Sequence, residues 1–254
     1  MIGIDTNNAP LLEMCELSFS WTRNAAPLFG PLNMSAEKGK IITLLGSNGT
    51  GKTTLLKVIA HRLSPSTGHV KVARRPSEIN DFNYMIQDSA RLLFPHLSLN
   101  QNLALRKSSK QESTSELTHL LFPDSQVLSR YPSQCSGGQR QRAVLCRAIE
   151  DMAAFPVTLL DEPFAQVSQD VKARVYSVAR KIVQEADRVA LVVTHDIPEA
   201  LILGDSVAVL SSSVLHIFDA SGVVDNASFL EAVELRDKVR RATISTCGST
   251  SPNV

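Results

Sequence analysis

The sequence has no long hydrophobic run, and no apolar stretch approaches the roughly 20 residues that a helix needs to cross a bilayer. Its N-terminus contains Asp5 and lacks the basic segment followed by an apolar one that marks a secretory signal. The four cysteines show no C-x-x-C pair and no metal-ligand spacing (Cys15, Cys135, Cys146 and Cys247). We therefore expect no transmembrane segment, and reduced thiols as in cytosolic proteins.

A large excess of charge of one sign is also missing. The 26 basic and 25 acidic side chains leave a net charge of +1, which provides no electrostatic footprint for nucleic acid or an anionic membrane surface. We expect no nucleic-acid partner. The 254 residues, 43% of them apolar, are enough for one large domain or two small ones with a sizeable core.

The most informative feature that is present is a glycine-rich stretch that fits G-x-x-x-x-G-K-[ST], a cradle for nucleoside triphosphates. It reads Gly46, Ser47, Asn48, Gly49, Thr50, Gly51, Lys52, Thr53 and Thr54. Glycines let backbone N–H groups turn toward phosphate oxygens. Lys52 can reach the β- and γ-phosphates, and the Thr53 hydroxyl is placed to ligate Mg²⁺. An apolar run at 41–45 precedes the loop and a helix at 53–60 follows it, as the motif requires.

Short apolar runs alternate with helical patterns along the rest of the chain. We expect strands near residues 11–19, 69–72, 84–86, 157–160, 189–194, 206–210 and 214–218, and helices near 136–150, 169–186 and 227–241. The polar run 106–116 is expected to be a mobile surface segment, and the tail after residue 243 to be disordered. The alternation predicts an α/β fold, with a mainly parallel sheet that has helices on both faces.

Two adjacent acids follow the buried strand at 157–160. Phosphoryl transfer needs a metal ligand and a group that orients or activates water, in addition to the phosphate cradle. Asp161 would hold Mg²⁺, directly or through water, and Glu162 would take the proton of the attacking water. A pair of acids after a strand is also compatible with a solvated loop or a helix cap, but the cradle at 46–54 favours the catalytic interpretation.

A second glycine-rich turn precedes the helix at 136–150, in the order Ser136, Gly137, Gly138 and Gln139. N–H groups and the helix dipole would make this turn another anion site. One chain needs only one cradle for a γ-phosphate. We therefore expect the second turn to hold a phosphate bound to another subunit.

With these motifs the chain resembles the nucleotide-binding subunits of ABC transporters. Residues 46–53 are similar to the Walker A motif of that family, 157–162 to Walker B, and 136–139 to its signature motif. Gln87 matches the Q-loop and His195 the switch histidine. The resemblance covers about residues 11–220. It implies a P-loop NTPase (ABC ATPase) fold in a single domain over 1–254, with an N-terminal antiparallel β-subdomain, a helical subdomain over about 88–150 and a disordered tail over about 242–254.

The family's roles then pass to these positions. The resemblance implies that Lys52 and the loop amides bind the phosphates of ATP, and that Thr53 and Gln87 approach Mg²⁺. It implies that Glu162 polarises water and that His195 contacts the γ-phosphate. Ser136 and Gly138 would close over ATP bound to the opposite subunit, so a second ATPase subunit is expected as a partner.

An aromatic residue before the P-loop stacks on adenine in this family. Trp21 best fits that place, and Phe19 is the alternative; a Trp21 packed in the core would have no such role. A stacked base is worth roughly 1–3 kcal/mol.

Two positions depart from the family's pattern. Cys135 stands where the signature motif usually begins with leucine, which is a small apolar exchange. Ser168 stands where the segment after Glu162 usually ends in an aspartate that communicates across the dimer. This exchange puts the coupling between the two ATP sites in question. Asp170 is a candidate to replace the missing aspartate, but it lies two residues after Ser168.

Several segments resemble those of import systems: Phe164 after Asp161-Glu162-Pro163, the run 93–98, Tyr131-Pro132, and Thr194-His195-Asp196. They imply an ATPase that energises import of a small solute at the cytoplasmic face of the cytoplasmic membrane. Permease subunits would contact residues 87–100, and a solute-binding protein would complete the assembly. The alternatives are an exporter or lipid-transport ATPase, and a soluble ABC ATPase of the iron–sulfur assembly type.

Overall fold

The computed structural model describes residues 9–23, 25–73, 81–86, 89–105, 111–211 and 214–220, with side chains omitted at 89–90 and 111–115. Gln87, the helix expected at 227–241 and the tail expected after 242 therefore lie outside the described residues. Within these ranges no helix is long and apolar enough to span a membrane. No disulfide joins Cys15, Cys135 and Cys146.

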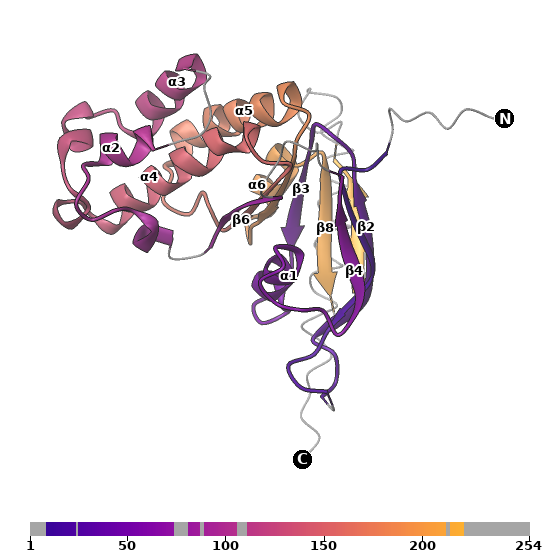
Figure 1. Ribbon diagram of the computed structural model, residues 1–254. Coiled ribbons are helices and arrows are strands. Elements are labelled where there is room, and N and C mark those ends of the chain that lie inside the picture. The colour runs from indigo at the N-terminus through magenta and orange to yellow at the C-terminus, as the bar shows by residue number, and fades with distance from the viewer. Residues whose placement is uncertain are drawn as a thin grey trace.

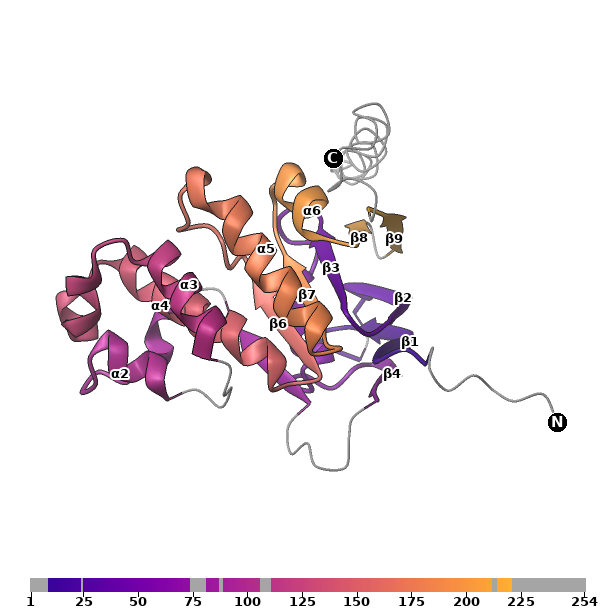
Figure 2. The same ribbon diagram turned by 90° about the horizontal axis from the view of Figure 1, so that it is seen from above.

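The described strands form two sheets (Figures 1 and 2). The first is antiparallel, in the order β2-β1-β4, from β1 (Leu12–Phe19), β2 (Phe29–Ala36) and β4 (Thr67–Val72). The second has the order β5-β6-β7-β3-β8-β9. Its strands are β3 (Lys40–Leu45), β5 (Phe82–Met85), β6 (Val157–Asp161), β7 (Val189–Val193), β8 (Ser206–Ser211) and β9 (Val214–Asp219). All its pairs are parallel except β8–β9, which confirms the mainly parallel sheet.

Alternate side chains of the central strands enter two different cores. Ile41, for example, joins a core that includes residues of α4 (Gly137–Glu150) and α5 (Gln169–Glu185). Its neighbour Ile42 joins the core on the opposite face, with the antiparallel sheet and α1 (Lys52–Ile59). Helices were expected on both faces, but one face is shared between α1 and the antiparallel sheet. The antiparallel β-subdomain thus covers part of one face of the central sheet.

The helical subdomain lies to one side of the central sheet (Figure 1). It contains α2 (Leu99–Ala104), α3 (Gln111–Leu121), α4 and short 3-10 turns, and its apolar side chains join the core of α5. The expectation of a mobile segment at 106–116 was wrong for 111–116, where α3 begins. The apolar residues that hold this helix lie later in it, at Leu117, Leu120 and Leu121, so the polar start alone was misleading.

One helix was missed altogether. The helix α6 (Ile197–Leu203) begins two residues after His195, and the Asp196 side chain caps it by accepting a hydrogen bond from the Glu199 N–H. Seven residues are too few for a clear apolar periodicity, although Asp196 with Pro198 in the first turn is a standard helix start. As a result α6 fixes the chain just after the switch histidine.

Candidate functional site

The site forms where three neighbouring strands of the central sheet end. The order β6-β7-β3 places the ends of these strands side by side, because parallel strands present their carboxyl ends at one edge. Asp161 and Glu162 follow β6, His195 follows β7, and the 46–51 loop follows β3. Backbone hydrogen bonds continue the sheet past its formal ends, from Glu162 N to Val193 O (3.0 Å) and from Thr194 N to Leu44 O (3.2 Å). The site therefore rests on a rigid part of the fold.

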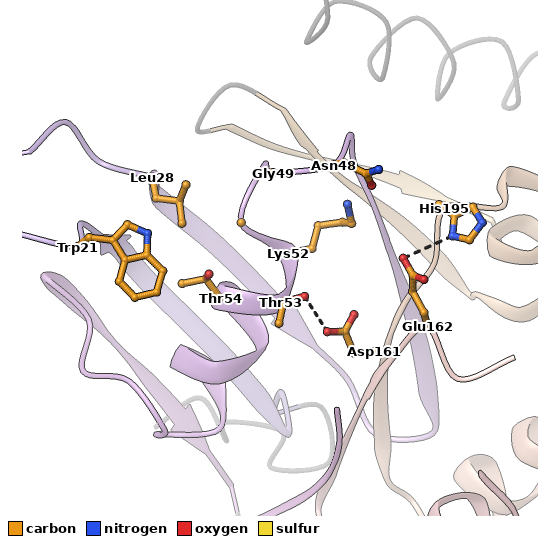
Figure 3. A pocket seen from close by; sticks show the side chains of 11 residues that line it. Trp21, Leu28, Asn48, Gly49, Lys52, Thr53, Thr54, Asp161, Glu162 and His195 are labelled. Carbon is orange, nitrogen blue, oxygen red and sulfur yellow. Dashed lines mark hydrogen bonds and ion pairs between the residues drawn. The ribbon is translucent and has the colours of Figure 1, made fainter. Parts of the chain in front are cut away.

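A cavity of about 730 Å³ opens at this edge (Figure 3). Eleven residues line it: Trp21, Leu28, Asn48, Gly49, Gly51, Lys52, Thr53, Thr54, Asp161, Glu162 and His195. Trp21 and Leu28 lie at one end, and Glu162 and His195 at the other, with Lys52 and Thr53 between them. An apolar end and a charged end thus share one cavity. Sequence reasoning did not identify Leu28, and an isolated leucine in a loop gives no signal for such a role.

The backbone of the 46–51 loop leaves the N-terminus of α1 open to this cavity. Gly51 occupies the N-cap position with a φ of 96°, and no side chain caps the helix. A Cβ at Gly51 would lie 3.0 Å from Leu28, so glycine is needed there for two reasons. The uncapped N–H groups and the helix dipole favour an anion at this point.

The ammonium group of Lys52 folds back over the loop. It donates hydrogen bonds to the carbonyl oxygens of Gly46 (2.7 Å) and Ser47 (2.9 Å). Burial lowers the pKa of Lys52, although the nearby Glu162 and Asp161 carboxylates oppose this shift. A buried cation held by carbonyl oxygens can exchange these partners for an anionic ligand. Thr50 stabilises the same loop through a hydrogen bond to Ser47 O at 2.9 Å.

Thr53 and Asp161 meet on the floor of the cavity. The Thr53 hydroxyl donates to Asp161 Oδ2 at 2.7 Å, and Asp161 is buried. Burial raises the pKa of Asp161, the Thr53 hydrogen bond lowers it, and Glu162 adds to the rise. One hydroxyl and one carboxylate side by side are hard oxygen ligands of the kind that Mg²⁺ takes together with phosphate oxygens and water. These two residues therefore fit the metal expected from the sequence.

Glu162 and His195 form a pair at the other end of the cavity. The His195 Nδ1 atom lies 3.4 Å from Glu162 Oε1. Glu162 has a φ of 49°, in the left-handed region that a residue with a Cβ rarely adopts. The neighbouring strand holds it there through the Glu162 N to Val193 O bond. This turn aims the carboxylate into the cavity, where it can accept a proton.

The aromatic residue at the open end is Trp21. Its side chain is 64% exposed and lines the cavity, so it is not packed in the core. Phe19 is only 6% exposed and does not line the cavity; its ring supports Trp21 edge-on, with centroids 5.0 Å apart. The geometry therefore favours Trp21 over Phe19 as the face available to a base.

The second glycine-rich turn lies apart from this cavity, at the start of α4. The Ser136 hydroxyl accepts a hydrogen bond from Gln139 N (3.2 Å), and the Gln139 side-chain Oε1 accepts one from Ser136 N (2.8 Å). Neither these residues nor Gly137 and Gly138 line the cavity. Cys135 is buried just before them and donates to Tyr131 O at 3.3 Å, in keeping with an apolar exchange there. The structure thus separates the two glycine-rich turns.

Three further positions from the sequence analysis are Ser168, Asp170 and Gln87. Ser168 stands at the N-cap of α5, but its hydroxyl makes no capping hydrogen bond. Asp170 lies in the first turn of the same helix and is exposed. The communication expected at this segment stays a prediction. Gln87 cannot be placed, since it is outside the described residues.

Comparisons with known proteins show what this chain is similar to. The family model described as "ABC transporter" matches residues 29–165. An Fe(3+) ions import ATP-binding protein of Haemophilus influenzae is 32% identical over 80% of this chain. An uncharacterised ABC transporter ATP-binding protein of Bacillus subtilis is 35% identical over 71% of both chains. The chain spans 60% of the length of the Haemophilus protein.

Two solved structures show the same fold. An ATP-binding subunit of an ABC transporter superposes with a TM-score of 0.67 at 22% identity, over 89% of this chain and 99% of that one. The dimeric cassette MJ0796, described in a post-hydrolysis state with ADP and Pi, gives a TM-score of 0.66 at 19% identity, over 82% of this chain and 98% of that one. At these identities the likeness establishes the fold.

Proposed function

The chain belongs to the ABC transporter family, and we propose that it is the ATP-binding and ATP-hydrolysing subunit that energises an importer. One observation carries the proposal: Lys52, Thr53, Asp161, Glu162 and His195 line a single cavity, although they come from three separate segments of the chain. This set provides a phosphate contact, a metal site and a proton acceptor together.

The phosphate chain of ATP fits the N-terminus of α1. In our proposal Lys52 exchanges its contacts with Gly46 O and Ser47 O for the β- and γ-phosphates. The loop amides of 46–51 and the first turn of α1 donate to the same oxygens. Thr53 and Asp161, already in contact at 2.7 Å, would hold Mg²⁺, which when bound neutralises charge on the transferred phosphoryl group. Gln87 is proposed as a further Mg²⁺ ligand from the family resemblance.

Hydrolysis falls to the pair at the other end of the cavity. We assign Glu162 as the group that accepts the proton of the attacking water, and His195 as the contact to the γ-phosphate. Their separation of 3.4 Å allows the imidazole to orient the carboxylate before it acts. A general base of this kind contributes roughly 10²–10⁴-fold to the rate.

Two further parts complete the proposed site: a place for the adenine ring and a contact from a second subunit. Trp21 presents an exposed ring on which adenine can stack, while Leu28 closes the apolar end. Since the Ser136–Gln139 turn lies outside its own cavity, we propose that it closes over the ATP of a second copy. The dimeric state described for the MJ0796 cassette supports this arrangement.

The helical subdomain offers an exposed apolar surface. Large apolar side chains are exposed there, at Leu92 (46%), Phe94 (45%), Leu105 (49%) and Tyr131 (47%). Buried Asn102 joins this region by donating to Phe94 O (3.1 Å) and Leu97 O (3.0 Å), and Leu99 N bonds to Arg130 O (2.9 Å). We propose that this surface and residues 87–100 receive the permease, which would place the chain at the cytoplasmic face of the membrane.

Import of a small solute is the direction that the relatives support. The Haemophilus relative is named for Fe(3+) import, and a Synechocystis relative, 36% identical over 73% of this chain and 54% of its own, for sulfate/thiosulfate import. In this assembly the cargo would contact the permease and a solute-binding protein. The chain's own residues therefore leave the choice of solute open.

Co-purification and phosphate release test the proposal together. The tagged full-length chain, isolated from its own membrane, should bring down a polytopic membrane protein and release phosphate from MgATP. A soluble scaffold complex in place of the membrane protein would favour the iron–sulfur assembly alternative and contradict import. Net export from vesicles would point to the exporter alternative.

A further inference from the structure

One face of α5 carries three polar side chains at helical spacing, Lys172, Tyr176 and Arg180. Residues four apart on a helix lie above one another, so the three form a single stripe. All of them point to α6 or to the segment just after it. The helices α5 and α6 are therefore joined by polar contacts as well as by apolar packing.

At the end near the catalytic site, the partner of the stripe is Glu199. Its carboxylate Oε2 accepts a hydrogen bond from Tyr176 Oη at 2.8 Å and another from Lys172 Nζ at 2.9 Å. The side chains of Glu199 and Lys172 are only 5% and 12% exposed, and Tyr176 is buried. Burial and the carboxylate raise the pKa of Tyr176, so its hydroxyl stays protonated and donates. A buried pair of this geometry fixes both helices strongly.

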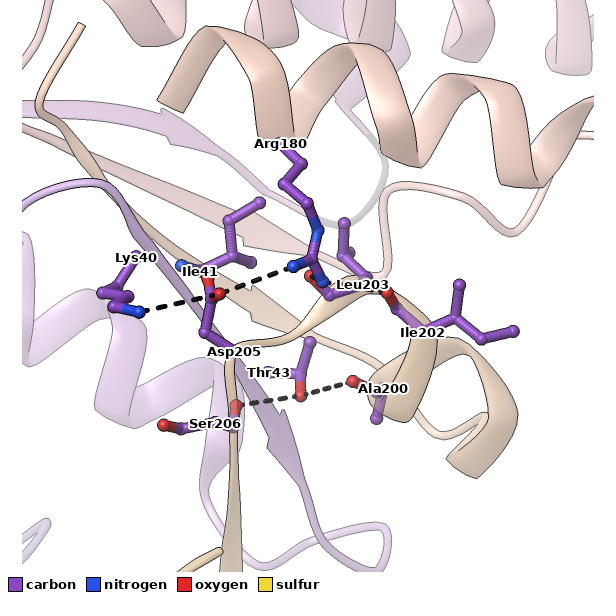
Figure 4. A network of polar contacts seen from close by, with 9 residues as sticks. All are labelled: Lys40, Ile41, Thr43, Arg180, Ala200, Ile202, Leu203, Asp205 and Ser206. Carbon is purple, nitrogen blue, oxygen red and sulfur yellow. Dashed lines mark hydrogen bonds and ion pairs between the residues drawn. The ribbon is translucent and has the colours of Figure 1, made fainter. Parts of the chain in front are cut away.

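At the far end a second contact serves as a comparison (Figure 4). Arg180 donates to the carbonyl oxygens of Ile202 (3.0 Å) and Leu203 (2.9 Å), and lies 3.4 Å from Asp205 Oδ1. Asp205 in turn accepts from Ile41 N at 2.8 Å, at the opposite end of β3 from the 46–51 loop. Among the residues that the structure describes, this network joins the same two helices without a contact to the catalytic end of the sheet.

The Tyr176–Glu199 hydrogen bond belongs to a closed ring of contacts that includes Glu162 and His195. From Glu162 the chain runs through Pro163 to Phe164, whose ring packs edge-on against Tyr176 with centroids 4.9 Å apart. Tyr176 bonds Glu199, and Glu199 N bonds the Asp196 carboxylate at 3.3 Å.

Asp196 follows His195, which lies 3.4 Å from Glu162 and so closes the ring. Asp196 N also donates to Thr194 Oγ1 at 3.1 Å, which fixes the turn that carries His195. The Tyr176–Glu199 contact thus supports both the turn that carries Glu162 and the turn that carries His195, from the side away from the cavity.

We propose that Tyr176 and Glu199, with Lys172, are positioning residues that hold Glu162 and His195 at the separation hydrolysis requires. The inference rests on the proposed ATPase function and adds residues that act behind the site. The three side chains do not line the cavity. They act through Phe164 on the Glu162 turn and through Asp196 on the His195 turn. Their loss should therefore slow turnover without weakening nucleotide binding.

A test replaces Tyr176 by Phe in the full-length chain, since Phe keeps the ring contact with Phe164 and removes only the hydroxyl. We expect kcat for MgATP to fall about tenfold, because small misplacements of catalytic groups are costly, and KM to stay within about twofold. The affinity for ADP, read from the fluorescence of Trp21, the only tryptophan, should not change. Glu199→Gln is a second variant that keeps the shape of the side chain and should act in the same direction.

The matched control is Arg180→Met, which cuts the far contact between the same helices. It should lower Tm at least as much as Tyr176→Phe while keeping kcat within about twofold of the unchanged chain. The ring signal of His195 in a ¹H–¹³C NMR spectrum, assigned by comparison with His195→Asn, should shift in Tyr176→Phe and stay in place in Arg180→Met. That signal can be read without ATP.

Three results would overturn the inference. Folded Tyr176→Phe could keep full kcat and an unshifted His195 signal. Arg180→Met could lower kcat as much as Tyr176→Phe does. Both contacts would then only stabilise the fold, and neither would position the catalytic pair. Finally, an unchanged chain that binds ADP but releases no phosphate from MgATP would overturn the proposed function and this inference with it. The last result is seen in the unchanged chain without any variant. Failure of the proposed function can therefore be distinguished from failure of the positioning role.

Discussion

Two helix N-termini of this protein follow glycine-rich turns, yet they are prepared differently. The N-terminus of α1 has no capping side chain and opens into the cavity. The N-terminus of α4 is closed by its own Ser136 and Gln139 and lies outside the cavity. An uncapped helix start can bind an anion within its own chain, whereas the capped one needs a ligand brought to it. In the proposed dimer, each chain would therefore provide two unlike halves of a shared ATP site.

The largest expected effect concerns the α1 half. Glu162→Gln should leave ATP binding intact and lower kcat by roughly 10²–10⁴, because the amide cannot accept the proton of water. Size-exclusion chromatography with MgATP should then show a trapped dimer, in which the α4 turn of each copy covers the ATP of the other. Glu37→Gln, in the exposed turn before β3, is the matched control. Normal turnover in Glu162→Gln would remove Glu162 from this role.

Lys52→Met, at the N-terminus of α1, should weaken ATP binding without lowering the stability of the fold. Loss of charge-assisted hydrogen bonds to phosphate should weaken ATP binding about 10- to 100-fold in Trp21 fluorescence titrations. The nucleotide-free variant should unfold at no lower temperature, because burial lowers the pKa of Lys52 and so the charge itself does not favour the folded state. Lys57→Met in the same helix controls for charge. Unchanged ATP affinity would contradict the assignment of α1 as the phosphate site.

The α4 half can be tested with a second capping box in the same subdomain. Ser136→Ala and Ser98→Ala each remove a serine cap whose hydroxyl accepts a hydrogen bond at 3.2 Å. Both should lower the free energy of unfolding by about 1 kcal/mol. In the Glu162→Gln background, Ser136→Ala alone should weaken ATP-driven dimerisation, by about tenfold if one hydrogen bond to a charged phosphate is lost. Equal dimerisation of the two variants would show that the α4 turn does not contact ATP.

The smallest expected effect is a pH dependence at Asp161. Its pKa is raised in the folded protein above an ordinary value near 3.8, so its contribution to stability is present below that value and is lost as the pH rises through the folded pKa. Nucleotide-free Asp161→Asn should therefore gain stability relative to the unchanged chain as the pH increases from 4 to 7. Thermal unfolding across that range would show it, and a difference that does not vary with pH would contradict the burial argument. With MgATP the order should reverse, since Mg²⁺ favours the ionised carboxylate.

Much of the fold could be predicted because its signals are local. Apart from β2, the strands follow from apolar periodicity and from turn residues, as do α1, α4 and α5, and each was predicted to within a few residues of its ends. The run 111–116 and α6 were not predicted. The former is held by a later apolar patch in the same helix, and the latter is too short to show a period. The choice between Trp21 and Phe19 as the residue that stacks on adenine also required the structure. The sequence does not show that Phe19 is buried and Trp21 exposed.

The sequence by itself determined the chemistry of the site. The loop at 46–54 places Lys52 and Thr53 because a glycine-rich turn must open a helix at that spacing, and Asp161-Glu162 must follow its buried strand. The tertiary structure decided which of these groups meet. Only the strand order β6-β7-β3 brings Glu162 to 3.4 Å from His195, and only the packing of α5 on α6 joins Tyr176 to Glu199. Such contacts link residues far apart in the chain, and their geometry depends on how complete layers pack.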